Sequence, residues 1–117
     1  MGQRVLFVVG AGVTIIFGIR PVYAQGDSMA GRKLYRAYCS PCHGESGKGD
    51  GQGARLLPVR PADHTDGTVM NKHTNKYLVG RSPYMPAWGG QLREGEMRDL
   101  IRYIRSLAVP AYKAEGK

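Results

Sequence analysis

The residues best suited to chemistry form one short segment, Cys39-Ser40-Pro41-Cys42-His43. Two cysteines separated by two residues and followed at once by a histidine are typical of a covalent haem attachment site. Residues three or four positions apart share one face of a helical turn, so both sulfurs can reach adjacent vinyl groups while the imidazole approaches the iron. The motif therefore predicts haem thioethers at Cys39 and Cys42 and a proximal iron ligand at His43.

Three other uses of this cysteine pair compete with haem. A structural zinc site needs four ligands, but the chain has only two cysteines, and His64 and His73 stand nine positions apart instead of about four to six. A thioredoxin-type redox pair needs a strand–helix–strand surround, which no stretch of the chain predicts. A disulfide across so short a segment would constrain very little chain. Haem is the favoured interpretation.

Met85 is the strongest candidate for the opposite iron ligand. It lies between Pro83 and Pro86, outside any periodic segment, where a restricted backbone suits a side chain that must be held at one distance from a metal. Packing on apolar stretches accounts for the other methionines beyond the first 24 residues, which are Met29, Met70 and Met97. A ligand at Met70 and an open coordination position remain as alternatives.

His64 and His73 are further candidates, because a second imidazole on the iron would give a bis-histidine haem of low potential. Each of them stands between polar neighbours in the sequence. We therefore expect both histidines on the surface or beside the ligands, and not on the iron.

The first element that must position these groups is a helix. Asp27 or Ser28 can cap a helix that runs to about Tyr38, and Pro41 should end it near Ser40. Its apolar positions are Met29, Leu34, Ala37 and Tyr38.

Loops and a short helix are expected to follow the motif. Residues 44–53 include five glycines and lack a phosphate-binding pattern, so they predict a plain loop. Residues 56–61, with two prolines, should continue as extended chain along the haem edge, where Leu56 and Leu57 make apolar contacts. Thr74 can cap a short helix over residues 75–79.

A longer amphipathic helix is predicted near the end of the chain. Glu94 and Glu96 lie in its first turn, where acidic side chains suit the helix dipole. Its apolar face is formed by Met97, Leu100, Ile101, Ile104, Leu107 and Ala108. Residues 109–117 are expected to end the helix and trail into solvent.

Three of these segments resemble class I cytochromes c, and the resemblance covers residues 27–107. They are the cysteine–histidine motif, the segment Met85-Pro86-Ala87-Trp88 and residues 99–104. The resemblance implies an all-α cytochrome c fold, a small helical domain wrapped around one covalently attached haem c. It also implies that the methionine segment is the sixth-ligand loop, and that the N- and C-terminal helices cross closely at Gly31 and Tyr103.

The first 24 residues have the pattern of a secretory signal peptide. A basic start precedes an apolar run over residues 5–19, and small residues surround a cleavage point after Ala24. The run is shorter than the ~20 residues of a spanning helix. The predicted organisation is a signal peptide over residues 1–24 and a monohaem cytochrome c domain over residues 25–117 in the periplasm. A membrane tether formed by an uncleaved N-terminal segment is the alternative.

The charge of the chain bears on its partners. It carries 17 lysines and arginines against nine acids, a formal net charge of +8, and loss of Arg4 and Arg20 with the leader would lower this to +6. Export and the scatter of the charges disfavour nucleic acid. A basic surface suits redox partner proteins with acidic docking surfaces, with an ordinary solvated surface as the alternative. No stable membrane insertion is expected if the signal is cleaved.

Nitrogen from His43 and sulfur from Met85 would leave the iron no open position, so we expect an electron carrier and not an enzyme. The soft thioether favours ferrous iron relative to a second imidazole. The prediction is a periplasmic one-electron carrier that shuttles electrons between redox partner proteins. The alternatives are a tethered or bound electron-transfer subunit of a dehydrogenase or respiratory complex, and a gas-binding or peroxidase-like haem protein.

Overall fold

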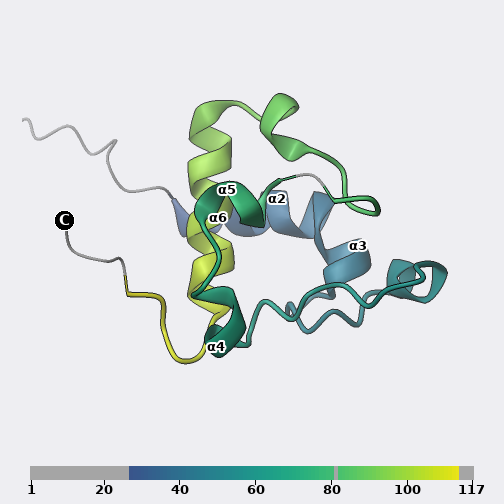
Figure 1. The fold of residues 1–117 in the computed structure, drawn as a ribbon. Helices are drawn as coiled ribbons and strands as arrows, with labels where there is room; N and C mark the ends of the chain where they lie inside the picture. Colours follow the sequence, from purple (N-terminus) through teal and green to yellow (C-terminus); the bar gives the residue numbers. More distant parts are fainter. Residues whose placement is uncertain (1–26, 81, 114–117) are drawn as a thin grey trace, which may run out of the picture.

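The computed structural model describes residues 27–80 and 82–113, and this part of the chain is helical (Figure 1). It contains two isolated β-bridges and no strand. The helices in chain order are α2 (Ser28–Tyr38), α3 (Ser40–His43), the 3₁₀ helix η2 (Gln52–Leu56), α4 (Gly67–Met70), α5 (Asn75–Leu78), the 3₁₀ helix η3 (Trp88–Gly90) and α6 (Glu94–Leu107). The predicted all-α cytochrome c fold is confirmed.

The N-terminal segment with the predicted cleavage point after Ala24 lies outside the described residues. Among the residues that are described, no helix has both the length and the apolar character needed to cross a membrane.

Helix α2 begins as the sequence predicts. The Asp27 side chain accepts a hydrogen bond from the Met29 backbone N–H at 2.8 Å, which satisfies one of the orphan donors of the first turn. The prediction for its apolar face is wrong at Met29, which is 62% exposed, and at Ala37 and Tyr38, which are also exposed. The buried positions of the helix are Gly31 and Tyr35, because α6 lies against that side.

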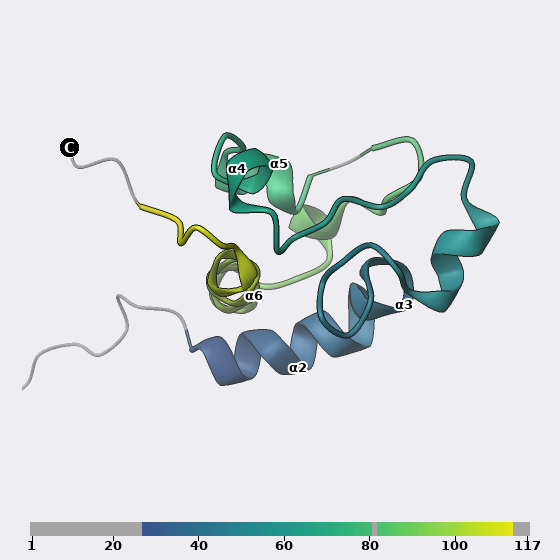
Figure 2. The same cartoon turned by 90° about the horizontal axis from the view of Figure 1, so that it is seen from below.

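The predicted crossing of the first and last helices is confirmed. Figure 2 shows α6 end on, with α2 running across it. A Cβ atom added to Gly31 would collide with the backbone carbonyl of Asp99 and would lie 2.9 Å from the Cβ of Tyr103. Only glycine permits the two backbones to approach this closely, so Gly31 sets the depth of the crossing.

Helix α6 contributes more residues to the core than any other helix of the described part of the chain. Glu96 caps its start, because the Glu96 carboxylate accepts from the Arg93 backbone N–H at 2.9 Å and from the Arg93 guanidinium at 2.8 Å. Leu100 and Ile104 are almost fully buried, and Met97, Ile101 and Leu107 pack against them, which confirms the predicted apolar face.

The segment after α6 does not trail freely, and this prediction is wrong for its first residues. The Val109 N–H donates to the Thr65 carbonyl at 2.9 Å, and the Gly67 N–H donates to the Val109 carbonyl at 3.1 Å. The Arg105 guanidinium lies 3.9 Å from the centre of the Tyr112 ring, a cation–π contact. Residues 109–112 are therefore fastened to α4 and α6.

Arg105 joins the last helix to the middle of the chain. Its guanidinium donates to the Met70 carbonyl at 2.8 Å and to the Asn75 side-chain oxygen at 3.0 Å. These bonds fix the segment between α4 and α5, which forms one wall of the site described next.

Candidate haem site

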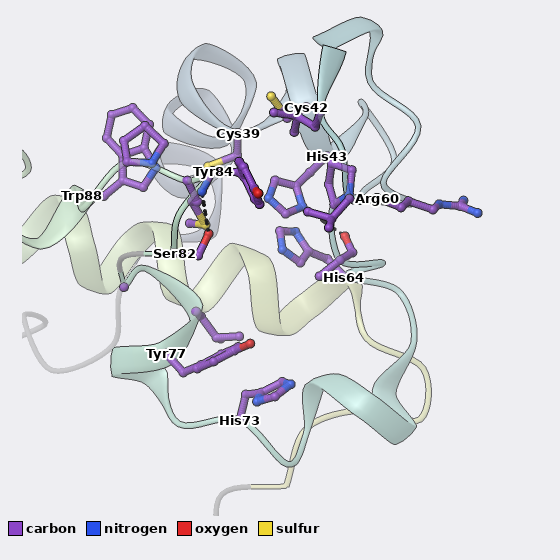
Figure 3. Close-up of a pocket in the computed structure, with 18 of the residues that line it drawn as sticks. Cys39, Cys42, His43, Arg60, His64, His73, Tyr77, Ser82, Tyr84 and Trp88 are labelled. Atoms are coloured by element: carbon purple, nitrogen blue, oxygen red, sulfur yellow. Dashed lines mark hydrogen bonds between the residues drawn. The ribbon is translucent and has the colours of Figure 1, made fainter. Parts of the chain in front are cut away.

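A single hollow brings the predicted site residues together. It has a volume of about 330 Å³, within the range of cofactor-sized pockets, and its lining is mostly apolar. Cys39, Cys42, His43 and Met85 all line it. In Figure 3, Trp88 and Ser82 lie across the pocket from His64 and Arg60.

The attachment motif forms a helical turn of its own. Cys39 ends α2, and the His43 N–H donates to the Cys39 carbonyl at 2.8 Å across α3. Pro41 lies in the first turn of α3, where its missing N–H is tolerated. This places both cysteines and the histidine along one edge of the hollow.

The alternatives to haem do not fit this turn. Both cysteines are free thiols, so the disulfide is absent. Burial, together with the neighbouring Cys42, raises the pKa of Cys39 to about 12, the opposite of the lowered pKa that activates a redox cysteine. Within residues 27–80 and 82–113, no group of three or more His, Cys, Asp or Glu side chains could hold a zinc ion.

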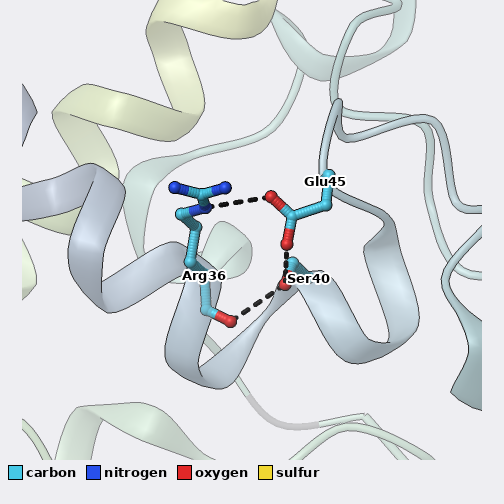
Figure 4. A network of polar contacts seen from close by, with 3 residues as sticks. All are labelled: Arg36, Ser40 and Glu45. Atoms are coloured by element: carbon cyan, nitrogen blue, oxygen red, sulfur yellow. Dashed lines mark hydrogen bonds and ion pairs between the residues drawn. The ribbon is translucent and has the colours of Figure 1, made fainter.

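A polar network anchors the turn to α2 (Figure 4). The Arg36 Nε donates to Glu45 at 2.9 Å. The Ser40 hydroxyl donates to the Arg36 carbonyl at 2.9 Å and approaches the second oxygen of Glu45 at 3.3 Å. Glu45 therefore links the start of α3 to the end of α2 from the loop that follows the motif.

One of the two ring nitrogens of His43 is available to bind a metal. Its Nδ1 lies 3.0 Å from the Ala62 carbonyl, and a carbonyl can only accept, so Nδ1 carries the proton. The Nε2 lone pair is then available to iron, the usual arrangement of a ligating histidine. Burial lowers the pKa of His43, and the Ala62 bond opposes this, so the ring stays neutral as a ligand must.

His64 is not on the surface. It is 4% exposed, and its ring lies parallel to that of His43, with centroids 4.1 Å apart and 16° between the planes. Burial, followed by the proximity of His43, lowers its pKa to about 3, so His64 is neutral. Because it covers one face of the His43 ring, it does not oppose His43 across the pocket, and this argues against a second imidazole ligand from His64.

His73 lines the pocket at a distance from the motif. It stacks on Tyr77 of α5, with ring centroids 4.0 Å apart (Figure 3). The Thr74 hydroxyl caps α5 by accepting from the Tyr77 N–H at 3.3 Å, which confirms the predicted cap.

Two methionines reach the pocket. Met85 is half-buried on the loop before η3, where its N–H donates to the Ser82 carbonyl at 3.3 Å. Met70, at the end of α4, is 3% exposed and also lines the hollow. The sequence explained Met70 as packing on the neighbouring Val69, but Val69 is 46% exposed and Met70 turns inward alone.

Residues 52–61 depart from the prediction. Part of the expected loop and extended segment is the 3₁₀ helix η2. Leu56 is 87% exposed and does not line the pocket, whereas Leu57 does. Arg60 also lines it, and its guanidinium donates to the Lys48 carbonyl at 3.1 Å. The sequence contained no signal that separated Leu56 from Leu57.

The residues present fit a covalent haem. Two thiols and a histidine with an available Nε2 line the hollow together with a thioether, and the remaining lining is largely aliphatic and aromatic. Such a lining excludes water from an apolar macrocycle.

The chain is similar to known c-type cytochromes. A family model described as "Cytochrome C oxidase, cbb3-type, subunit III" matches residues 26–104. The chain is 34% identical over 97 residues to the "Cbb3-type cytochrome c oxidase subunit FixP" of Azorhizobium caulinodans, covering 72% of this chain and 29% of that protein. It is 31% identical over 102 residues to a cytochrome c of Theileria parva, covering 72% of this chain and 89% of that one.

A solved structure shares the fold. It belongs to the Kuenenia stuttgartiensis reducing HAO-like protein complex Kustc0457/Kustc0458, with a TM-score of 0.57 and 23% identity, over 77% of this chain and 46% of that chain. The chain thus spans less than half of that structure and less than a third of the FixP relative.

Proposed function

The chain belongs to the c-type cytochromes of the cbb3-type oxidase subunit III family, and we propose that it is a periplasmic one-electron carrier ligated by His43 and Met85. Its cofactor is haem c, which supplies a reversible ferric–ferrous couple when bound. Electrons pass between the domain and redox partner proteins. The observation that supports the assignment is that both cysteines, His43 and Met85 line one hollow.

Each side chain has a separate task in this proposal. Cys39 and Cys42 would hold the macrocycle by thioethers. His43 binds through Nε2 while the Ala62 carbonyl holds Nδ1. Met85 supplies a soft sulfur from a loop that two prolines stiffen. Ligation by both His43 and Met85 would leave a bound haem no position for oxygen or peroxide, which favours electron transfer over catalysis.

The first experiment tests the ligands through the optical spectrum of the purified holoprotein. Ferric haem bound to methionine sulfur has a charge-transfer band in the far red. We expect this band in the wild type and in Met70→Leu, and we expect its loss in Met85→Ala. A band that survives Met85→Ala but disappears in Met70→Leu would transfer the assignment to Met70.

Carbon monoxide tests the gas-binding alternative. A firmly bound methionine should keep carbon monoxide from the reduced wild-type protein, whereas Met85→Ala should bind it readily. Fast, tight binding by the wild type would favour a gas-binding or peroxidase-like protein over a carrier.

A second candidate function is an electron-transfer subunit of a respiratory complex. The FixP relative is named as an oxidase subunit, and this chain matches only part of it. Fractionation of native cells distinguishes the two: a carrier is released with the periplasmic contents, whereas a bound or tethered subunit sediments with membranes. The same experiment tests whether residues 1–24 are cleaved as a signal peptide.

The net charge of +8, or +6 once a leader over residues 1–24 is removed, supports partners with acidic docking surfaces. Exposed charges are screened beyond about 8 Å at physiological salt, so electron exchange with an acidic partner should slow as ionic strength rises. A rate that does not change with salt would remove the electrostatic part of the proposal.

A further inference from the structure

We propose that His64 is a positioning residue that fixes the plane of the His43 imidazole and thereby tunes the iron site. Its ring lies face to face with that of His43, as Figure 3 shows. The inference rests on the proposed function, because it requires His43 to be an iron ligand.

One hydrogen bond does not fix the orientation of the His43 ring. The bond between Nδ1 and the Ala62 carbonyl, 3.0 Å long, holds a single edge of the imidazole. The ring can still tilt about that edge. A second ring whose centroid is 4.1 Å away, and whose plane differs by only 16°, blocks the tilt on the covered face. Stacking on His64 therefore restricts the tilt of the His43 ring that the hydrogen bond alone permits.

His64 is itself held from two directions. Its backbone N–H donates to the Gly47 carbonyl at 2.7 Å, and its Nδ1 is hydrogen-bonded to the Tyr35 hydroxyl at 3.2 Å. Gly47 has a φ of +84°, and a Cβ there would lie 3.3 Å from the Cβ of His64. The loop after the motif is thus shaped around this side chain.

Tyr35 connects His64 to the most rigid part of the fold. It is fully buried at the crossing of α2 and α6, where its ring centroid lies 5.2 Å from that of Tyr103. A contiguous path of contacts therefore runs from the helix crossing through Tyr35 and His64 to the predicted ligand. Outer partners of a ligating histidine set its orientation and its basicity, which are the protein's means of adjusting a haem.

A matched pair of variants distinguishes a His64 ring that orients His43 from a side chain that only fills the space beside it. His64→Phe keeps a flat ring against His43, whereas His64→Leu fills similar space without a flat face. Both are purified with covalent haem and measured by low-temperature electron paramagnetic resonance of the ferric state and by redox titration. We expect the principal g-values of His64→Phe to match the wild type. We expect those of His64→Leu to shift, with a shifted reduction potential.

A control variant addresses general disturbance of the fold. Tyr112→Leu removes an aromatic ring that contacts Arg105 and does not line the pocket, and it should leave the g-values unchanged. Wild-type g-values in His64→Leu, or equal shifts in the leucine and phenylalanine variants, would overturn the proposal.

The test also covers two other outcomes, failed maturation of His64→Leu and failure of the proposed iron ligation. If His64→Leu does not mature, Tyr35→Phe removes only the hydroxyl that restrains His64, and a broadened spread of g-values is expected; an unchanged spectrum counts against the inference. Failure of the underlying function is recognised separately. In that case the wild-type spectrum itself lacks the low-spin signature of histidine and methionine ligands.

Discussion

His43 and Met85 face the same pocket, but the segments that carry them are held in different ways. The turn with His43 is fastened by the network of Arg36, Ser40 and Glu45, by the Ala62 carbonyl and by the stacked ring of His64. The loop with Met85 makes local hydrogen bonds. The Tyr84 N–H donates to the Ser82 hydroxyl at 3.4 Å, and the Met85 N–H donates to the Ser82 carbonyl at 3.3 Å.

The exposed fractions of the side chains also differ between the histidine side and the methionine side of the pocket. On the histidine side His64 is 4% exposed, whereas Tyr84 beside Met85 is 50% exposed. The difference indicates that the fold concentrates its stability behind His43 and leaves the methionine loop near the low end of local stability.

The largest expected effect comes from a substitution at the crossing of α2 and α6, which supports the histidine side of the pocket. Gly31→Val forces a branched side chain against the Asp99 carbonyl, and we expect a loss of about 3 kcal/mol, the upper part of the usual range for overpacking. Urea unfolding of the holoprotein measures it. Gly90→Val, beyond the methionine loop, is the control: its Cβ would meet nothing within 4 Å, and we expect a change under about 0.5 kcal/mol. Equal losses would remove the contrast between the two sides.

The next prediction concerns opening of the methionine loop without global unfolding. The far-red band of the ferric protein should disappear at a lower urea concentration than the helical circular dichroism signal. We expect a local opening free energy roughly 2 kcal/mol smaller than that of global unfolding. Coincident transitions would mean that the loop is as firmly held as the histidine turn.

A smaller effect is expected from the cap of α5, on the wall that carries Tyr77. Thr74→Ala removes the hydroxyl that accepts from the Tyr77 N–H and should cost about 1 kcal/mol. Thr74→Ser keeps the hydroxyl and should stay close to the wild type. Thermal unfolding of the three holoproteins gives the comparison, and a loss of similar size in both variants would rule out the cap as the cause.

The smallest effect tests the anchor of the histidine turn. Glu45→Gln weakens its pair with Arg36, but both side chains are more than half exposed, so about 0.5 kcal/mol is expected after solvent screening. Glu94→Gln breaks an exposed pair with Arg98 that supports no part of the site. Unfolding in low salt should show the larger loss in Glu45→Gln; the reverse order would mean that the network adds nothing to the turn.

Much of this fold could be predicted because its signals are local. The caps at Asp27 and Thr74 and the apolar face of α6 depend on residues within a few positions of one another. The contact of Gly31 with Tyr103 is long-range, and it was predictable only through the resemblance to a known family.

Positions that the sequence could not fix depend on distant partners. The sequence placed His64 either on the surface or beside the ligands, and contacts with Gly47, Tyr35 and His43 place it beside His43. No local pattern contains that information. The same holds for Val109, whose bridge to Asp66 joins segments far apart in the sequence.

The contact between the two ends of the domain also has a kinetic consequence. The Asp27 N–H donates to the Asp99 side chain at 2.6 Å, across 72 residues. Closing a loop of that length carries a high entropic cost, and contacts of such high sequence separation slow folding. The attachment turn, by contrast, contains only neighbours in sequence and can form early. Docking of α6 onto α2 is therefore the step that should set the folding rate, and Arg105 of α6 can fix the segment between α4 and α5 only after α6 has formed.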